Sequence, residues 1–229
     1  MLPQIQTAVF KTKIPSLNRE ILMRPFLVKE EKILLMAKQS GEKDQIFLAI
    51  KQVIQNCVVD ESLDISRLPY YDIEYLFIQL RINSVGEFIE IEITDPDTGE
   101  RCPATVNLED VNIISGDVVD RVIINDHTAL IMKYPSLDEI SRVTTDNDVQ
   151  AFFDTLKYCI KSVFHEDQTY EFYSYSDHEK EEFVDSLTVK NIEECKDWIA
   201  AMPSVEVEAK WKEGKKNKSM KLKGINNFF

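Results

Sequence analysis

The sequence predicts an α+β fold, in which amphipathic helices pack with short antiparallel strands and two β-hairpins. Several segments have the i, i+3, i+4, i+7 apolar spacing of helices, and two others alternate apolar and charged residues as half-buried strands do. With 229 residues and 44% hydrophobic content, the chain can bury a substantial core as one large domain or two small ones. Only six glycines are present, which suits regular helices and strands and argues against a glycine-rich phosphate loop.

Residues 1–27 are predicted to form an extended N-terminal arm with one or two short strands. Pro3, Pro15 and Pro25 exclude a long helix in this segment. An extended apolar arm either pairs with strands of its own chain or docks on a partner. We expect pairing within the chain.

A helix is predicted over residues 28–39. Its first turn is charged, and the early glutamates suit the positive end of the helix dipole. Val28, Leu35 and Met36 can share one helical face with Phe26 beneath them. We interpret this segment as a core helix that begins with a solvated charged turn.

Two more helices and a hairpin follow. Apolar spacing predicts helices over residues 43–57 and from Pro69 to about Gly86. Residues 88–93 alternate apolar and charged side chains, Asp95–Gly99 has the composition of a turn, and residues 105–108 form the returning strand. Further short strands are expected at residues 111–114, 121–124 and 129–133.

The second half is predicted to be mainly helical. A capping box at Ser136 opens a short helix, and a long helix runs from Asp146 or Asn147 to about residue 164. Residues 166–175 are expected to be a polar, tyrosine-rich linker. The remaining predicted elements are helices at 176–186 and 188–202 and a second hairpin, with strands at 205–211 and 220–223 and a turn at 212–219.

This order divides the chain into an extended arm (1–27), an α+β half with the first hairpin (28–145), and a helical half that ends in a lysine-rich hairpin (146–229). Segments 70–108 and 189–223 share a helix–hairpin layout. An internal repeat is possible, but helix-then-hairpin is a common layout and the sequence identity is weak, so this interpretation stays open.

No pattern typical of an enzyme is present. The sequence lacks G-x-x-x-x-G-K-S/T, G-x-G-x-x-G, G-x-S-x-G and H-E-x-x-H. The histidines fall in predicted turns or at helix ends, where we expect surface or capping roles: His127, His165 and His178. We therefore predict a protein that is not an enzyme and has no cofactor.

Three of the four cysteines fall on apolar helical stripes and are expected to be core thiols: Cys57, Cys159 and Cys195. The N-terminal residues do not have the pattern of a signal peptide, and no apolar run is long enough to cross a membrane. We expect the chain to be made in a reducing cytoplasm.

The charge of the chain is unevenly distributed. The whole sequence carries −13, whereas Lys210–Lys223 contains seven lysines and one glutamate, a net of +6 that leaves −19 on the remainder. This hairpin is either a solvated edge protected by lysines or a dock for an acidic partner. Nucleic acid is a third possible partner, and the acidic remainder argues against it.

Parts of the chain resemble a known family. The segment Arg24-Pro-Phe-Leu-Val-Lys-Glu-Glu-Lys-Ile-Leu-Leu-Met-Ala37 is similar to the N-terminal segment of the T-even-type phage baseplate hub subunit and hub assembly protein family. Lys133-Tyr134-Pro135 before a helix and the ending Gly224-Ile-Asn-Asn-Phe-Phe229 agree with it. The resemblance implies a non-enzymatic hub component of a contractile-tailed phage, located in the tail baseplate of the virion and assembled in the host cytoplasm.

That resemblance also implies which partners the chain binds, and it raises the question of whether the hairpin tips bind zinc. The expected partners are other hub and tail proteins, with no membrane and no small-molecule substrate. Hairpin tips in the family can carry paired cysteines in a zinc knuckle, but the first tip here offers only Cys102 and the second offers none, so we predict no zinc.

The candidate partner-binding residues lie in the turn before the first helix, in the lysine-rich hairpin and at the C-terminus: Arg24, Phe26, Lys29, Glu30, Lys210, Trp211, Lys215, Lys216, Phe228 and Phe229. Two alternatives remain open at this stage. One is a transient assembly chaperone that is absent from the finished virion, and the other is a host-directed binder or small cytoplasmic enzyme.

Overall fold

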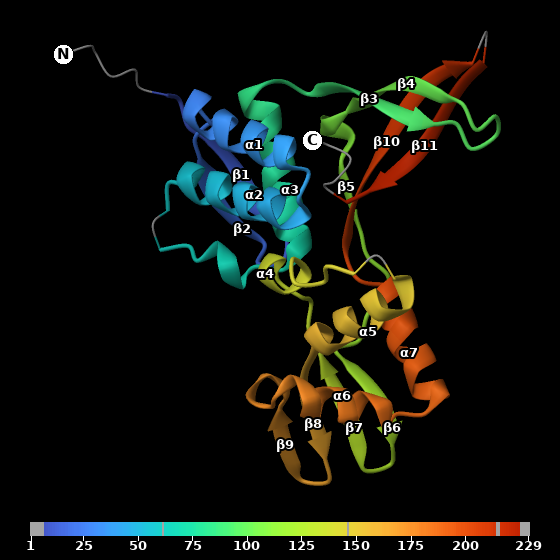
Figure 1. The fold of residues 1–229 in the computed structure, drawn as a ribbon. Helices are drawn as coiled ribbons and strands as arrows, with labels where there is room; N and C mark the ends of the chain where they lie inside the picture. The colour runs from blue at the N-terminus through green and yellow to red at the C-terminus, as the bar shows by residue number, and fades with distance from the viewer. Residues whose placement is uncertain (1–6, 61, 146, 214–215, 225–229) are drawn as a thin grey trace. The chain divides into compact units, whose positions relative to one another are not determined.

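The computed structural model describes residues 7–60, 62–145, 147–213 and 216–224 (Figure 1). The described part contains seven α-helices and eleven strands in small antiparallel sheets, so the predicted α+β class is confirmed. The chain forms two compact units. We call residues 1–114 with 204–229 the first unit and residues 115–203 the inserted unit.

The first unit begins with a hairpin. Strands β1 (Phe10–Ile14) and β2 (Arg19–Met23) pair antiparallel, and Asn18 has the positive φ of 52° that their connecting turn requires. The buried side chains of this hairpin include Ile14, Ile21 and Met23. The expectation that the N-terminal segment pairs within its own chain is confirmed for the described residues.

Three helices follow at the predicted places. They are α1 (Val28–Ser40), α2 (Lys43–Cys57) and α3 (Tyr70–Ser84). Helix α1 ends at Gly41, whose φ of 69° is the left-handed conformation that glycine adopts without strain. Helices α1 and α2 lie side by side (Figure 1), and α2 and α3 supply much of the buried core of this unit.

The sheet of the first unit joins two hairpins that are distant in sequence. Its strands are ordered β11-β10-β4-β3, and β5 also pairs with β10. The bounds are β3 (Phe88–Thr94), β4 (Arg101–Asn107), β5 (Asn112–Ile114), β10 (Ser204–Glu213) and β11 (Lys216–Lys223).

The second hairpin is longer than the sequence suggested. The expected turn at 212–219 is wrong, because β10 continues to Glu213 and β11 begins at Lys216. The cause is cross-strand pairing, which extends to Lys212↔Asn217 and Glu213↔Lys216. Lysines are poor strand formers in isolation, but a paired strand with one solvated face tolerates them.

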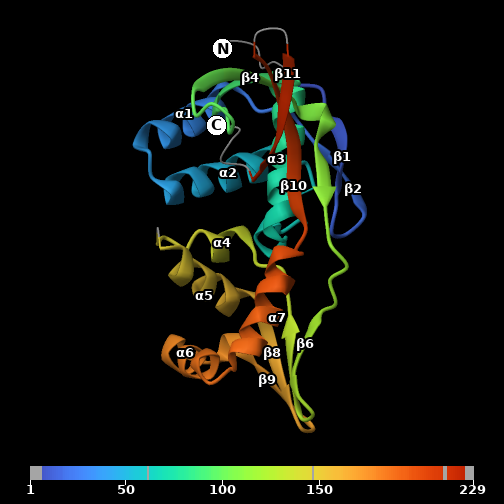
Figure 2. The same ribbon diagram turned by 90° about the vertical axis from the view of Figure 1, so that its right-hand side faces the viewer.

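The inserted unit is an antiparallel four-stranded sheet with helices on one side (Figure 2). Its strands are ordered β6-β7-β8-β9, and its core includes Leu130, Leu156 and Trp198. The bounds are β6 (Arg121–Asn125), β7 (Thr128–Met132), α4 (Leu137–Ile140), α5 (Asp148–Cys159), β8 (Ile160–His165), β9 (Gln168–Glu171), α6 (Asp177–Asp185) and α7 (Val189–Ala200).

Two predictions within this unit are wrong. The long helix ends at Cys159 rather than near residue 164, and Ile160–His165 is strand β8. The supposed linker at 166–175 contains strand β9, which pairs with β8. The apolar residues near the junction fit both helical and strand spacing, so pairing with β7 and β9 decides the structure.

The two units do not coincide with the segments 1–27, 28–145 and 146–229 expected along the chain. Strand β10 returns to pair with β4 and β5, which brings the C-terminal hairpin into the same unit as the N-terminal residues. The helix–hairpin layout occurs twice, yet α7 belongs to the inserted unit while the hairpin after it belongs to the first.

Candidate interaction surfaces

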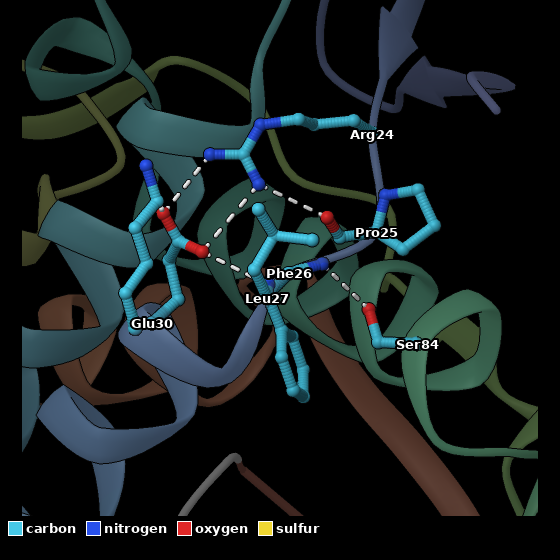
Figure 3. A network of polar contacts seen from close by, with 7 residues as sticks. Arg24, Pro25, Phe26, Leu27, Glu30 and Ser84 are labelled. Carbon is cyan, nitrogen blue, oxygen red and sulfur yellow. Dashed lines mark hydrogen bonds and ion pairs between the residues drawn. The ribbon is translucent and has the colours of Figure 1, made fainter. Parts of the chain in front are cut away.

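The turn before α1 is held by a buried ion pair. Pro25 keeps Arg24 extended, so the Arg24 side chain lies over the first turn of α1 (Figure 3). Arg24 Nη2 donates to Glu30 Oε1 at 2.9 Å, and the Leu27 backbone N–H donates to Glu30 Oε2 at 2.9 Å. The Glu30 side chain is 0% exposed, so one carboxylate ties the arm and the start of the helix together.

The same network reaches the other helices of the first unit. Arg24 Nη1 donates to the Pro25 carbonyl at 3.0 Å, and the Phe26 N–H donates to Ser84 Oγ on α3 at 3.0 Å (Figure 3). Burial by itself raises the pKa of Glu30, but the bonds from Arg24 and Leu27 outweigh it and leave that pKa lowered. The bond to Glu30 raises the pKa of Arg24.

The candidate residues in this turn therefore divide into two groups. Arg24 and Glu30 contact each other and face inward, Phe26 is half-buried, and Lys29 is exposed with its Nζ 3.5 Å from Glu30 Oε1. Only Lys29 is largely free for a partner to contact. Arg24 and Glu30 fix the start of the helix, and their charges neutralise each other instead of facing a partner.

The outward face of α1 carries apolar side chains. We use this name for Val28, Leu35 and Met36, which are 66%, 58% and 71% exposed. The opposite side of the helix is the buried one, with Glu30, Leu34 and Ala37. The interpretation of Val28, Leu35 and Met36 as a core face is wrong, because these three side chains are exposed and the buried side of α1 is that of Leu34 and Ala37.

Two residues of the lysine-rich hairpin, Trp211 and Lys218, form hydrogen bonds within the first unit. Trp211 is 6% exposed, and its Nε1 donates to Asp95 Oδ2 at 3.0 Å. Lys218, its cross-strand partner, donates to the same Asp95 oxygen at 3.0 Å and lies 2.9 Å from Asp97. Asp95 lies at the tip of the β3–β4 hairpin, so this cluster joins the two hairpins.

The Asp95 carboxylate is strongly stabilised. The Asp97 N–H donates to Asp95 Oδ1 at 2.9 Å, and this bond, with those from Lys218 and Trp211, lowers the pKa of Asp95 to about 2. Trp211, proposed from the sequence as a partner contact, is thus turned into the first unit.

The remaining hairpin lysines differ in their surroundings. Lys210 lies near Glu208 and Asp110, and Lys221 lies 2.7 Å from Glu206. Lys212 and Lys216 are exposed near the end of the hairpin. The predicted partner residues Lys215, Phe228 and Phe229 lie outside the described residues.

The histidines and cysteines form no recognisable catalytic group. His127, His165 and His178 are exposed, and burial raises the pKa of Cys57, Cys159 and Cys195 to about 11, 12 and 11. All three of these cysteines are fully buried and free, as predicted. In the described ranges, no group of three or more His, Cys, Asp or Glu side chains is placed to hold a metal ion. No helix of the described chain is long and apolar enough to span a bilayer.

Sequence reasoning missed the Asp95 cluster and the exposure of α1. A signal for the cluster was present in the alternation of both strands, since a register that pairs Lys212 with Asn217 sets Trp211 opposite Lys218. The exposure of Leu35 and Met36 had no such signal, because periodicity shows which residues share a face and not what covers that face.

Comparison with known proteins identifies a family. A family model described as T4 bacteriophage base plate protein matches residues 6–229. No curated protein and no solved structure matches the chain. The match covers both compact units, including the Arg24–Glu30 junction, the outward face of α1 and the lysine-rich hairpin. The chain therefore belongs to the T4 bacteriophage base plate protein family.

Proposed function

We propose that this chain is a component of the baseplate hub of a contractile-tailed phage and works by binding other hub and tail proteins, without catalysing a reaction. Membership of the base plate family supports a role in the phage tail. The outward face of α1 is the observation that carries the binding role. It leaves apolar side chains in water on a helix that is otherwise packed into the first unit.

A partner that covers this face would bury the side chains of Val28, Leu35 and Met36, and this burial would favour binding. These side chains recur at positions i, i+7 and i+8, which is the spacing by which a helix docks into a groove or onto a second helix. The Arg24–Glu30 pair contributes by fixing the start of α1, so the surface is presented in one orientation. Such pre-organisation lowers the entropy that binding must overcome.

The exposed end of the lysine-rich hairpin is the second proposed contact. Lys212 and Lys216 are exposed there, and Lys29 is a separate exposed lysine at the start of α1. Charges at the edge of an interface mainly steer association and select partners. An acidic hub or tail protein fits this surface, and assembly of the complex in the host cytoplasm is part of the same proposal.

Substitution of the outward face of α1 tests the proposal. We expect Leu35→Glu with Met36→Glu to leave the free energy of unfolding within about 0.5 kcal/mol per site, because both side chains are already solvated. The variant should fail to restore particle assembly to a phage that lacks the wild-type gene. The readouts are thermal unfolding and counts of complete tails.

The matched control is Val149→Glu with Val189→Glu, which places two carboxylates at exposed apolar positions of the inserted unit. Normal assembly with this control and failed assembly with the α1 variant support the proposal. Normal assembly with both variants would show that the outward face of α1 is not a binding surface.

Quantitative mass spectrometry tests whether the hub role is permanent. Purified particles and late-infection lysate are compared, and we expect the protein in particles at a fixed ratio to known tail proteins. Abundance in the lysate with absence from the particles would instead favour a transient assembly factor, which binds the same partners and then leaves.

A further inference from the structure

The inserted unit contains a groove that the proposed hub contacts do not use. The groove has a volume of about 590 Å³ and lies between α6 and the four-stranded sheet, and each of the strands β6 to β9 contributes to its lining. Its apolar lining is Ile124, Val163, Tyr170, Phe172, Phe183 and Leu187. The volume and apolar character are those of sites that hold side chains or small ligands.

The groove is built from well-fixed elements. Phe172 and Phe183 meet edge to face, with ring centroids 5.9 Å apart. On α6 the lining residues Glu179 and Phe183 are four positions apart, which places them on one side of the helix. A Ser176 capping box fixes the start of that helix, with the Ser176 N–H donating to Glu179 Oε2 at 2.8 Å.

The charged and polar groups at the groove already have partners within the unit. Glu179 serves the capping box, Lys180 Nζ lies 3.4 Å from Asp177, and His165 Nδ1 lies 2.8 Å from Thr128 Oγ1. The lining therefore offers mainly apolar contact. An occupant anchored by aliphatic or aromatic side chains matches it better than a polar small molecule does.

The surroundings of the groove determine the charge of the occupant. Residues 166–185, which supply β9 and α6, contain eight acidic residues and one lysine. The inserted unit as a whole has nineteen acidic and eight basic residues, a net charge of −11, whereas the first unit carries −2. An apolar groove within a strongly acidic unit favours a basic partner by long-range attraction.

We propose that this groove binds a basic segment of a partner protein, in which apolar anchor residues enter the groove and flanking lysines or arginines face the acidic surface. The inference rests on the groove and its charge alone. Its failure would leave the α1 surface and the baseplate assignment untouched.

Three labelled synthetic peptides of equal length test the proposal by fluorescence anisotropy on the full-length protein. They alternate lysine with leucine, glutamate with leucine, and lysine with serine. We expect the lysine–leucine peptide to bind at least about tenfold more tightly than either of the others, and added salt to weaken it. Equal binding of all three, or no binding of the lysine–leucine peptide, would overturn the proposal.

Two variants locate the binding. Ser186 is exposed in the groove lining, so Ser186→Trp should fill the groove and weaken the lysine–leucine peptide by about tenfold. Val149→Trp adds the same ring at an exposed position of α5 outside the lining and should have no effect. If Ser186→Trp fails to fold, Tyr175→Ser replaces it, because Tyr175 lines the groove and is 39% exposed.

Sedimentation velocity without peptide provides the remaining outcome. Oligomers of the wild-type protein that disappear in the Ser186→Trp variant would show that a second copy occupies the groove, and would overturn the proposal. Unchanged peptide affinity in the groove variants would overturn it as well.

Discussion

At the scale of single residues, the Arg24–Glu30 pair shows how a charged turn can be part of the core. The sequence places four charged residues at the start of α1, and such a run usually forms a solvated surface. Here Pro25 keeps the chain extended, so Arg24 reaches Glu30 six positions later. The burial of Glu30 depends on this tertiary geometry, which spacing within the helix does not reveal.

Removing the guanidinium should destabilise the first unit. Arg24→Ala leaves the Glu30 carboxylate buried without its cation, a change that costs about 3 kcal/mol of the free energy of unfolding. Lys29→Ala is the control, because the Lys29 side chain is 68% exposed and its loss should cost less than about 0.5 kcal/mol. Denaturant unfolding measures both, and equal stability of the two variants would show that the pair does not hold the fold.

At the scale of elements, the sequence located most helices and strands, and its failures share one cause. The bounds of α1, α2, α3 and the β3–β4 hairpin agree closely with the amphipathic patterns. The errors fall where cross-strand pairing sets the structure, at Ile160–His165 and at Lys216–Lys223. The preference of a segment for a strand depends on the side chains that it packs against in the sheet, so its own composition did not identify these strands.

The Asp95 cluster links two hairpins and should make their association sensitive to acid. The lowered pKa of Asp95 means that its contribution to stability is present above its ordinary pKa of 3.8 and is lost as the pH falls towards about 2. We expect the stability difference between wild type and Asp95→Asn to be constant at neutral pH and to shrink over that range.

Urea unfolding at a series of pH values measures this difference. Asp117→Asn, an exposed position in the inserted unit, is the control and should have little effect on stability. A difference for Asp95→Asn that does not change with pH would contradict the role given to the carboxylate.

At the scale of the whole molecule, the inserted unit interrupts one sheet at a single place. Ile114 and Ser204 are direct partners in the β5–β10 pair, and on the other side the Gly116 N–H donates to the Ala201 carbonyl at 3.0 Å. The two chain crossings between the units are thus adjacent. Sequence patterns gave no sign of this, because residues 115–203 have ordinary α+β composition.

Because the two connections between the units are adjacent, we predict that each unit folds separately. Paired antiparallel neighbours can be joined by a two-residue turn, so replacing residues 115–203 with Asn-Gly should leave the first unit folded. The isolated segment 115–203 should fold as well, since it has its own core. Circular dichroism during heating checks each piece, and a shortened chain without cooperative unfolding would contradict the prediction.

The buried thiols give this arrangement a practical consequence. Cys57 lies in the first unit, and Cys159 and Cys195 lie in the inserted unit. Each thiol is shielded from solvent, so it can form a thiolate and react only when the surrounding structure unfolds locally. Pulsed alkylation followed by peptide mapping would therefore record the opening of each unit separately in the unmodified chain, with Cys102, which is partly exposed in the folded state, as the internal reference.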